Sequence, residues 1–222
     1  MFDGSTHWSM LLDVSQREEA WRYFYENYQG AVVALFRHEG APASDVDDLA
    51  HEFFLVTLSS EFLLKADPKR GRFRAYLKTA ARRFLGAERR KAGRQKRRPK
   101  GGLVEFDEGI GVAATRGMTP EEAFDLAWAR SVLERGLART KNELSLKGRA
   151  AQFEALKLRQ DGASWKEIGK AMGTTPGAAR GWVDRAEQIM ARHIREEVSG
   201  TVASEDALGE ELQELTAILA RA

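Results

Sequence analysis

The sequence predicts an all-α protein with two small helical domains, a flexible linker between them and a C-terminal helical extension. Apolar residues recur at helical spacing in one segment after another. A glycine-rich stretch, at which the charge changes sign, divides the chain near its middle. With 222 residues, 43% of them hydrophobic, the chain has room for one or two such domains with packed cores.

The first domain is expected over residues 1–98. Residues 15–38 keep a helical apolar period and predict its first helix. Ser44 and Asp45 offer an N-cap followed by more acidic residues, which predicts a second helix that ends at about Ser59. A short helical turn and a loop should then lead into a long basic helix.

The basic helix lies in a segment whose charge differs sharply from that of the rest of the chain. Within residues 69–100, Lys and Arg fill 15 positions and Glu88 is the only acid. The segment carries +14, so the remaining residues carry −12 to give the total of +2. Such an asymmetry indicates an anionic partner.

The same segment also has an apolar stripe at helical spacing, formed by Phe73, Tyr76, Leu77, Ala80, Ala81, Phe84 and Leu85. We expect this stripe to dock on a core while the basic faces stay outside, including the row of Arg74, Lys78 and Arg82. The alternative is a solvated helix that continues into a disordered tail. A merely solvated helix usually mixes charge signs, whereas this one repels itself unless phosphates neutralise it.

Residues 99–119 are expected to form the linker, because five glycines and a change from basic to acidic character mark them. The second domain is expected over residues 120–197. Thr119 as N-cap and Pro120 at the first helical position predict its first helix. A further helix is expected over about 147–160.

A helix-turn-helix is predicted next. Ser164 begins a short helix, Gly173 to Thr175 form a tight turn, and Pro176 begins a longer helix. Small residues at the start of the longer helix permit close approach to a DNA groove, and its arginines can reach bases or phosphates. The residues expected to face outward are Thr175, Gly177, Ala178, Arg180, Gly181, Asp184 and Arg185. The alternative is an ordinary helical hairpin without a role in DNA binding.

The C-terminal extension, residues 198–222, is acidic and helical in pattern. Its apolar face consists of Leu208, Leu212, Leu215, Ile218 and Leu219. One hypothesis is that this extension folds back on the second domain, which ends in basic residues, and limits the binding of DNA or of a partner protein. The other is that it only completes the core of that domain.

Composition excludes several classes of protein. The chain has no cysteine, which excludes disulfides, thiol catalysis and Cys-ligated zinc and is typical of a cytoplasmic protein. It contains no apolar run of about 20 residues and no secretory signal pattern at its N-terminus, so we expect no membrane insertion. No phosphate loop or nucleophile motif occurs, and we expect neither an enzyme nor a cofactor.

Three motifs occur in a telling order. The pattern D-x-x-D-L-x-Q-E-x-F matches residues 45–54, with His51 in place of Gln. The pattern F-R-x-W-L-x-x-x-A-R-N matches residues 73–83, with Tyr76 for Trp and Arg83 for Asn. In this order the motifs resemble extracytoplasmic-function (ECF) sigma factors, the two-domain class of the sigma-70 family of bacterial RNA polymerase.

The third motif of this family, Y-x-E-I-A-x-x-L-G-x-S-x-G-T-V-K, matches residues 165–180. Ala178 replaces Thr, and Gly181 follows where Ser is usual, which weakens any transfer of base preference. The resemblance covers about residues 15–197. The C-terminal pattern resembles a subgroup with a C-terminal extension that is common in planctomycetes.

The resemblance implies a fold and a set of contacts. The first domain would be a sigma region 2 bundle that binds core RNA polymerase and melts the minus-ten element, with loop 62–72 holding a flipped base. The second would be a sigma region 4 helix-turn-helix that reads the minus-thirty-five element through the outward-facing residues named above. Minus-ten contacts would come from Lys69, Arg70, Arg72, Phe73, Tyr76, Lys78, Thr79, Arg82, Arg83, Arg89 and Arg90. Core polymerase contacts would come from Asp45, Asp48, Leu49, His51, Glu52 and Phe53. An anti-sigma or other regulatory protein would be a further partner.

Two other functions remain open at this stage. An autonomous helix-turn-helix transcriptional regulator would bind duplex DNA unaided, although the chain shows no clear dimer interface or ligand pocket. A metal-dependent nuclease would use the dense acidic cluster, because carboxylates and an imidazole can hold a divalent ion. That cluster consists of Asp45, Asp47, Asp48, His51 and Glu52.

Overall fold

The computed structural model describes residues 17–59, 62, 72–96, 117–202 and 204–221. Within these residues the chain forms eight helices and no strand, so the all-α prediction is confirmed. The chain divides into two compact units. One consists of residues 1–129 and 201–222, and the other of residues 130–200.

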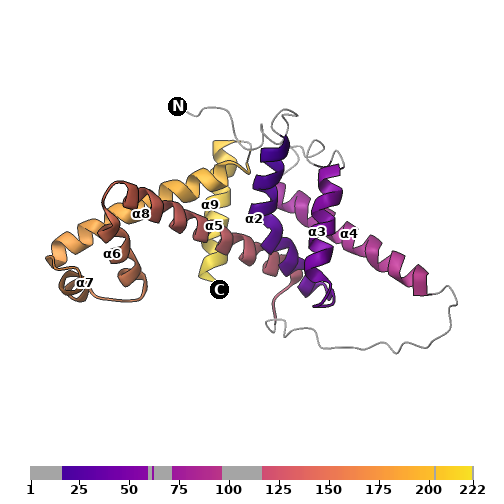
Figure 1. Ribbon diagram of the computed structural model, residues 1–222, viewed down its shortest axis with the longest axis horizontal. Helices are drawn as coiled ribbons and strands as arrows, with labels where there is room; N and C mark the ends of the chain where they lie inside the picture. Colours follow the sequence, from indigo (N-terminus) through magenta and orange to yellow (C-terminus); the bar gives the residue numbers. More distant parts are fainter. Residues whose placement is uncertain (1–16, 60–61, 63–71, 97–116, 203, 222) are drawn as a thin grey trace. The chain divides into compact units, whose positions relative to one another are not determined.

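Three helices form the centre of the first unit: α2 (Arg17–His38), α3 (Val46–Ser59) and α4 (Phe73–Lys96). Figure 1 shows α2 and α3 side by side with α4 crossing them, and all three pack against one another. Aromatic side chains fill the space between them. Phe24 meets Phe54 and Phe73 in edge-on contacts at 5.0 and 5.6 Å between ring centroids, and all three rings are buried. This core holds α4 by its predicted apolar stripe.

The first unit also contains the start of α5 (Pro120–Leu146) and all of α9 (Glu205–Ala220). Thr119 caps α5 as predicted, since its hydroxyl accepts from the Glu122 amide while the Glu122 carboxylate accepts from the Thr119 amide. The hydrogen bonds from Thr119 lower the pKa of Glu122. Phe124 and Trp128, one turn apart, are buried. The opening turns of α5 therefore belong to a core, and that core is in the first unit.

The second unit holds the rest of α5 with α6 (Ala150–Gln160), α7 (Trp165–Ala171) and α8 (Pro176–Ser199). Its core joins α6, α7 and α8 through buried Leu156, Ile168 and Val183. Ser164 caps α7 with a capping box, and Gly173 adopts φ 63° in the turn to α8. Figure 1 shows the short α7 followed directly by the long α8. The predicted helix-turn-helix geometry is present.

The grouping of segments differs from the expected domains in two places. The start of α5 was expected in the second domain, but residues 120–129 group with the first unit. The extension was expected to dock on the second domain, but residues 201–222 also group with the first unit. This grouping differs from the hypothesis that the extension folds onto the helix-turn-helix domain. The predicted linker, 99–119, lies outside the described residues up to residue 116.

Candidate nucleic-acid interface

Helix α4 has an open basic face. Thr79, Arg83, Arg90 and Arg94 lie three to four residues or seven residues apart and are exposed, which places them along one side of the helix. Within the described residues, Arg83, Arg90 and Arg94 form no ion pair. Arg89, Arg90, Gly93 and Arg94 line a hollow of about 470 Å³. This side of α4 offers cationic groups to an anionic ligand.

A second face of α4 also carries cations, but carboxylates of the same unit neutralise them. Lys78 Nζ lies 2.8 Å from Asp125 Oδ2 of α5. Arg82 binds Glu39 Oε1 through Nε at 2.6 Å and also pairs with Glu121. We expected both side chains to contact DNA, and here each has an internal partner. We call the row of Arg72, Arg74, Lys78 and Arg82 the closed face.

Arg72, at the start of the closed face, is surrounded by acids of α9. Its guanidinium lies 3.4 Å from Glu210 Oε2 and 3.3 Å from Glu211 Oε2, and it also pairs with Glu214. One cation therefore meets three carboxylates from one helix. This cluster is the main polar contact between α4 and the C-terminal extension.

Arg74 is the centre of the closed face and is almost completely buried, with 3% of its side chain exposed. Its Nε donates to Glu211 Oε1 at 2.5 Å, and its NH1 donates to Asp125 Oδ1 at 2.6 Å. The guanidinium carbon lies 4.0 Å from the ring centroid of buried Trp128. Burial by itself would lower the pKa of Arg74, but Glu211 and Asp125 outweigh it and raise the pKa, so the arginine stays charged. The expectation that the whole row beside the stripe lies outside is wrong for Arg74.

The aromatic residues expected to stack on unpaired bases are engaged in the protein. Phe73 is 2% exposed and contacts the rings of Phe24 and Tyr28, so it is a core residue and not part of a DNA surface. Tyr76 is half-buried, stacks on Phe62 at 4.6 Å and donates its hydroxyl to the Phe62 carbonyl at 2.9 Å. Burial raises the pKa of Tyr76. Lys69, Arg70 and most of loop 62–72 lie outside the described residues.

Helix α3 presents the expected acidic face. Asp45, Asp48, His51 and Glu52 are all exposed, while Leu49 is half-buried. Phe53, which was expected among the partner contacts, is 2% exposed and packs on Phe36, so it belongs to the core beneath this face. Leu55 and Val56 follow on the same helix with 47% and 46% exposure. Acidic residues beside exposed aliphatic ones form a surface suited to a partner protein.

The helix-turn-helix exposes its predicted recognition residues to different degrees. Thr175, Gly177, Arg180, Asp184 and Arg185 are exposed, and Ala178 and Gly181 are half-buried. The Thr175 hydroxyl accepts from the Ala178 amide at 3.1 Å, so it serves first as the cap of α8. Gly169 explains the tight turn, because a Cβ at this position would lie 2.9 Å from the Thr174 carbonyl oxygen.

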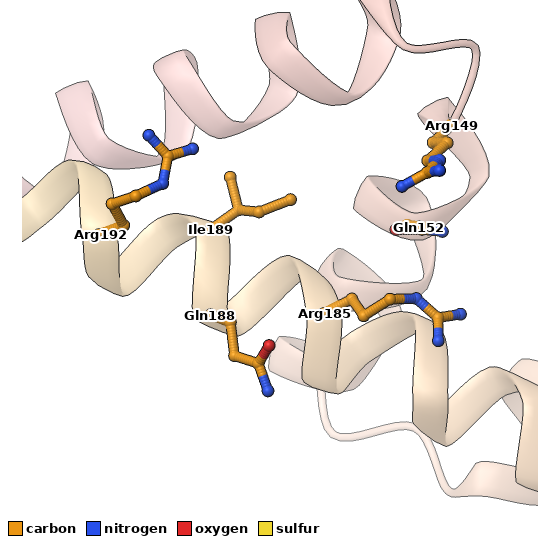
Figure 2. Close-up of a pocket in the computed structure, with 6 residues that line it drawn as sticks. All are labelled: Arg149, Gln152, Arg185, Gln188, Ile189 and Arg192. Carbon is orange, nitrogen blue, oxygen red and sulfur yellow. The ribbon is translucent and has the colours of Figure 1, made fainter.

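A basic cleft of about 350 Å³ lies between α6 and α8 in the second unit. Figure 2 shows Arg149 at the start of α6 and Arg185 on α8 facing the same opening, with Ile189 and Arg192 further along α8. Arg192 is held by Glu143 and Glu196, and these hydrogen bonds raise its pKa. Arg149 and Arg185 form no ion pair within the described residues. The cleft extends the cationic surface of α8 toward α6.

Sequence reasoning missed the acidic partners of the closed face. Neither Asp125 nor Glu211 was among the residues that the sequence assigned to a site. Neither has a local signal, because Asp125 lies 51 residues from Arg74 and Glu211 lies 137 residues from it. A hint was available in Glu211 itself, whose position between Leu208 and Leu215 places it on the buried side of α9.

Comparisons with known proteins found no match for this chain among protein-family models, curated proteins or solved structures. No helix in the described part of the chain is long and apolar enough to cross a membrane. Among the same residues, no three His, Asp or Glu side chains converge in a way that could hold a metal ion.

Proposed function

We propose that this protein is a sigma factor of the ECF type that binds core RNA polymerase and directs it to promoters. The observation that carries the proposal is that the two units expose different surfaces. One unit has an α-helix with an open row of arginines and a second helix with an acidic and aliphatic face. The other has a capped helix-turn-helix with exposed recognition residues. The motif order in the sequence supports the same function.

The open face of α4 is the proposed contact with the minus-ten region. Arg83 and Arg90 neutralise phosphates, which supplies salt-dependent affinity without base specificity. Because Phe73 is buried, this face has no exposed aromatic ring from the helix start for stacking. Helix α8 is the proposed reader of the upstream duplex, where Arg180 and Arg185 face the major groove and its phosphates.

The exposed face of α3 is the proposed docking surface for core polymerase. Asp48, Glu52 and Leu55 follow one another at i, i+4 and i+7 on this helix. Complementary charge on the partner would steer the encounter, and the aliphatic side chains would be buried in the complex.

Association with core polymerase is the decisive test. Asp48→Arg combined with Glu52→Arg should abolish pull-down of core polymerase from the native host, while circular dichroism remains that of a helical protein. The matched control is Glu18→Arg with Glu26→Arg, which makes the same charge change on exposed positions of α2. Undiminished capture of core by the α3 variant, or equal loss in the control, would contradict the proposed docking surface.

A promoter assay separates sigma factor from autonomous regulator. A sigma factor needs core polymerase for tight promoter binding, whereas a regulator binds duplex DNA alone. With core present, Arg83→Ala plus Arg90→Ala should impair strand opening, read by permanganate reactivity of unpaired thymines. Arg180→Ala plus Arg185→Ala should instead weaken binding of the upstream duplex and spare opening on a pre-melted template. Tight specific duplex binding without core would favour the regulator.

A further inference from the structure

Helix α9 packs against the closed face of α4 with an apolar side that contains one carboxylate. Ser204 caps it by accepting from the Ala207 amide, and Leu208 and Leu215 are buried on one side. Glu211 lies between these leucines, one turn from each, and is only 1% exposed. The helix therefore carries a carboxylate in the middle of its apolar face, where an unpaired charge would be strongly destabilising.

Two arginines, Arg72 and Arg74, bind the Glu211 carboxylate. Glu211 Oε1 accepts from Arg74 Nε at 2.5 Å, and its Oε2 lies 3.3 Å from Arg72 Nε. Glu214 Oε2 is 3.3 Å from Arg74 Nη2, which adds a third carboxylate to this guanidinium after Glu211 and Asp125. Arginine forks bind carboxylates and phosphates by the same charge-assisted geometry. The site that holds α9 thus has the chemistry of a phosphate site.

We propose that α9 is an intramolecular competitor of nucleic acid, which holds the closed face of α4 until a phosphate backbone displaces it. This inference rests on the proposed function, since it assigns α4 to DNA. Arg72 is central to it, because this residue belongs to the expected minus-ten contacts and here meets three carboxylates of one helix.

Two features make α9 displaceable. Residues 200–204 alone join it to the end of α8, so it can leave α4 without unfolding another helix. Only Leu208, Glu211 and Leu215 of its sixteen residues are fully buried, while Leu212, Ile218 and Leu219 are half-buried, so part of its apolar face stays exposed.

The first experiment measures DNA affinity of the full-length chain. Glu211→Gln keeps the size of the side chain but weakens the competitor, and Asp206→Asn makes the same charge change at an exposed position of α9. The probe is a single-stranded oligonucleotide, titrated by fluorescence anisotropy at several salt concentrations. Glu211→Gln should bind severalfold more tightly, with a salt slope steeper by about 0.7 for each cation released. Asp206→Asn should show neither effect.

The second experiment follows α9 in the unchanged protein, so it does not depend on how the variant folds. Amide hydrogen exchange is measured with and without saturating oligonucleotide. Competition predicts that residues 205–220 lose protection when DNA binds, while the amides of α2 and α3 do not. Unchanged or increased protection of α9 in the DNA complex would overturn the proposal and make the helix a permanent part of the first unit.

Failure of the proposed function gives a different pattern. In that case Arg83→Ala with Arg90→Ala leaves oligonucleotide binding unchanged, and core polymerase is not captured by any variant. Loss of binding in the Arg83/Arg90 variant together with a DNA-insensitive α9 rejects only the competition.

Discussion

The two units contain ionic networks of similar size but different placement. In the first, Arg74 and Glu211 are both almost fully buried and lie 137 positions apart in the sequence. In the second, Glu143 lies at the edge of α5 with 19% of its side chain exposed and accepts from Lys147 and Arg192, at 2.7 and 2.5 Å. His193 Nε2 lies 2.8 Å from the same carboxylate.

The two networks differ in solvent exposure, and this decides how strongly each charge depends on its partner. The Glu143 network is partly hydrated and partly local, since Lys147 is four residues away on the same helix. Its members can lose a partner and gain water. The members of the Arg74 network cannot exchange a partner for water in this way, because Arg74 and Glu211 are almost fully buried, so each needs the other or another ion of the same charge for its neutralisation.

The largest expected effect comes from breaking the buried pair on one side. Arg74→Met roughly keeps the volume but leaves Glu211 buried without its main partner, and should lower the free energy of unfolding by about 3–5 kcal/mol. Urea denaturation followed by tryptophan fluorescence measures it. Adding Glu211→Met in the same chain should recover most of the loss, because two apolar residues replace two charges. If Arg74→Met alone were as stable as the wild type, water would have to reach Glu211 in the folded protein.

The next effect concerns the edge network and depends on pH. Hydrogen bonds from Lys147 and then Arg192 lower the pKa of Glu143 from 4.5 to about 2. A carboxylate with a lowered pKa in the folded state stabilises the fold above its unfolded pKa and loses that contribution as pH falls. Glu143→Gln should therefore be less stable than wild type at pH 7, and the two should converge between pH 4.5 and 2. A difference that does not change with pH would exclude this titration as the cause.

A wholly local hydrogen-bond pair gives a smaller reference effect. Ser164 and Glu167 form a capping box at α7, and the hydrogen bonds from Ser164 lower the pKa of Glu167. Ser164→Ala should cost about 1 kcal/mol, because one amide of the first turn loses its acceptor. Thermal unfolding of the full chain measures the change. A loss as large as that of Arg74→Met would contradict the ranking of buried over local interactions.

The smallest expected effect on stability is that of Arg83→Ala, on the open face of α4. Its side chain is exposed and has no ion pair within the described residues, so stability should change by no more than about 0.5 kcal/mol. The substitution should instead change DNA binding. On a single-stranded probe, the slope of log K against log salt concentration should become smaller in magnitude by about 0.7. Arg74→Met serves as the contrast, with a large loss of stability. A change of stability in Arg83→Ala without a change of slope would reverse the assignment of the two faces.

Several features followed from the sequence alone, because their causes are local. Helical apolar periods predicted the all-α class, and the capping residues Thr119, Ser164 and Thr175 lie where the helices begin. The turn at Gly173 and the exposed positions of α8 follow from spacing within a few residues. The acidic face of α3 and the open face of α4 were also readable, since a helix shows its faces in its periodicity.

The tertiary structure alone decided which of the basic residues are available. Arg74, Lys78 and Arg83 look alike in sequence, yet one is buried, one is paired with Asp125 and one is open. Their fates depend on Asp125 and Glu211, which fold next to α4 from distant parts of the chain. Periodicity says which residues share a face but not which segment covers that face, because the covering segment is chosen by packing and charge over long range. The unit to which α9 belongs was decided in the same way, by a carboxylate that is stable in an apolar helix face only beside Arg74.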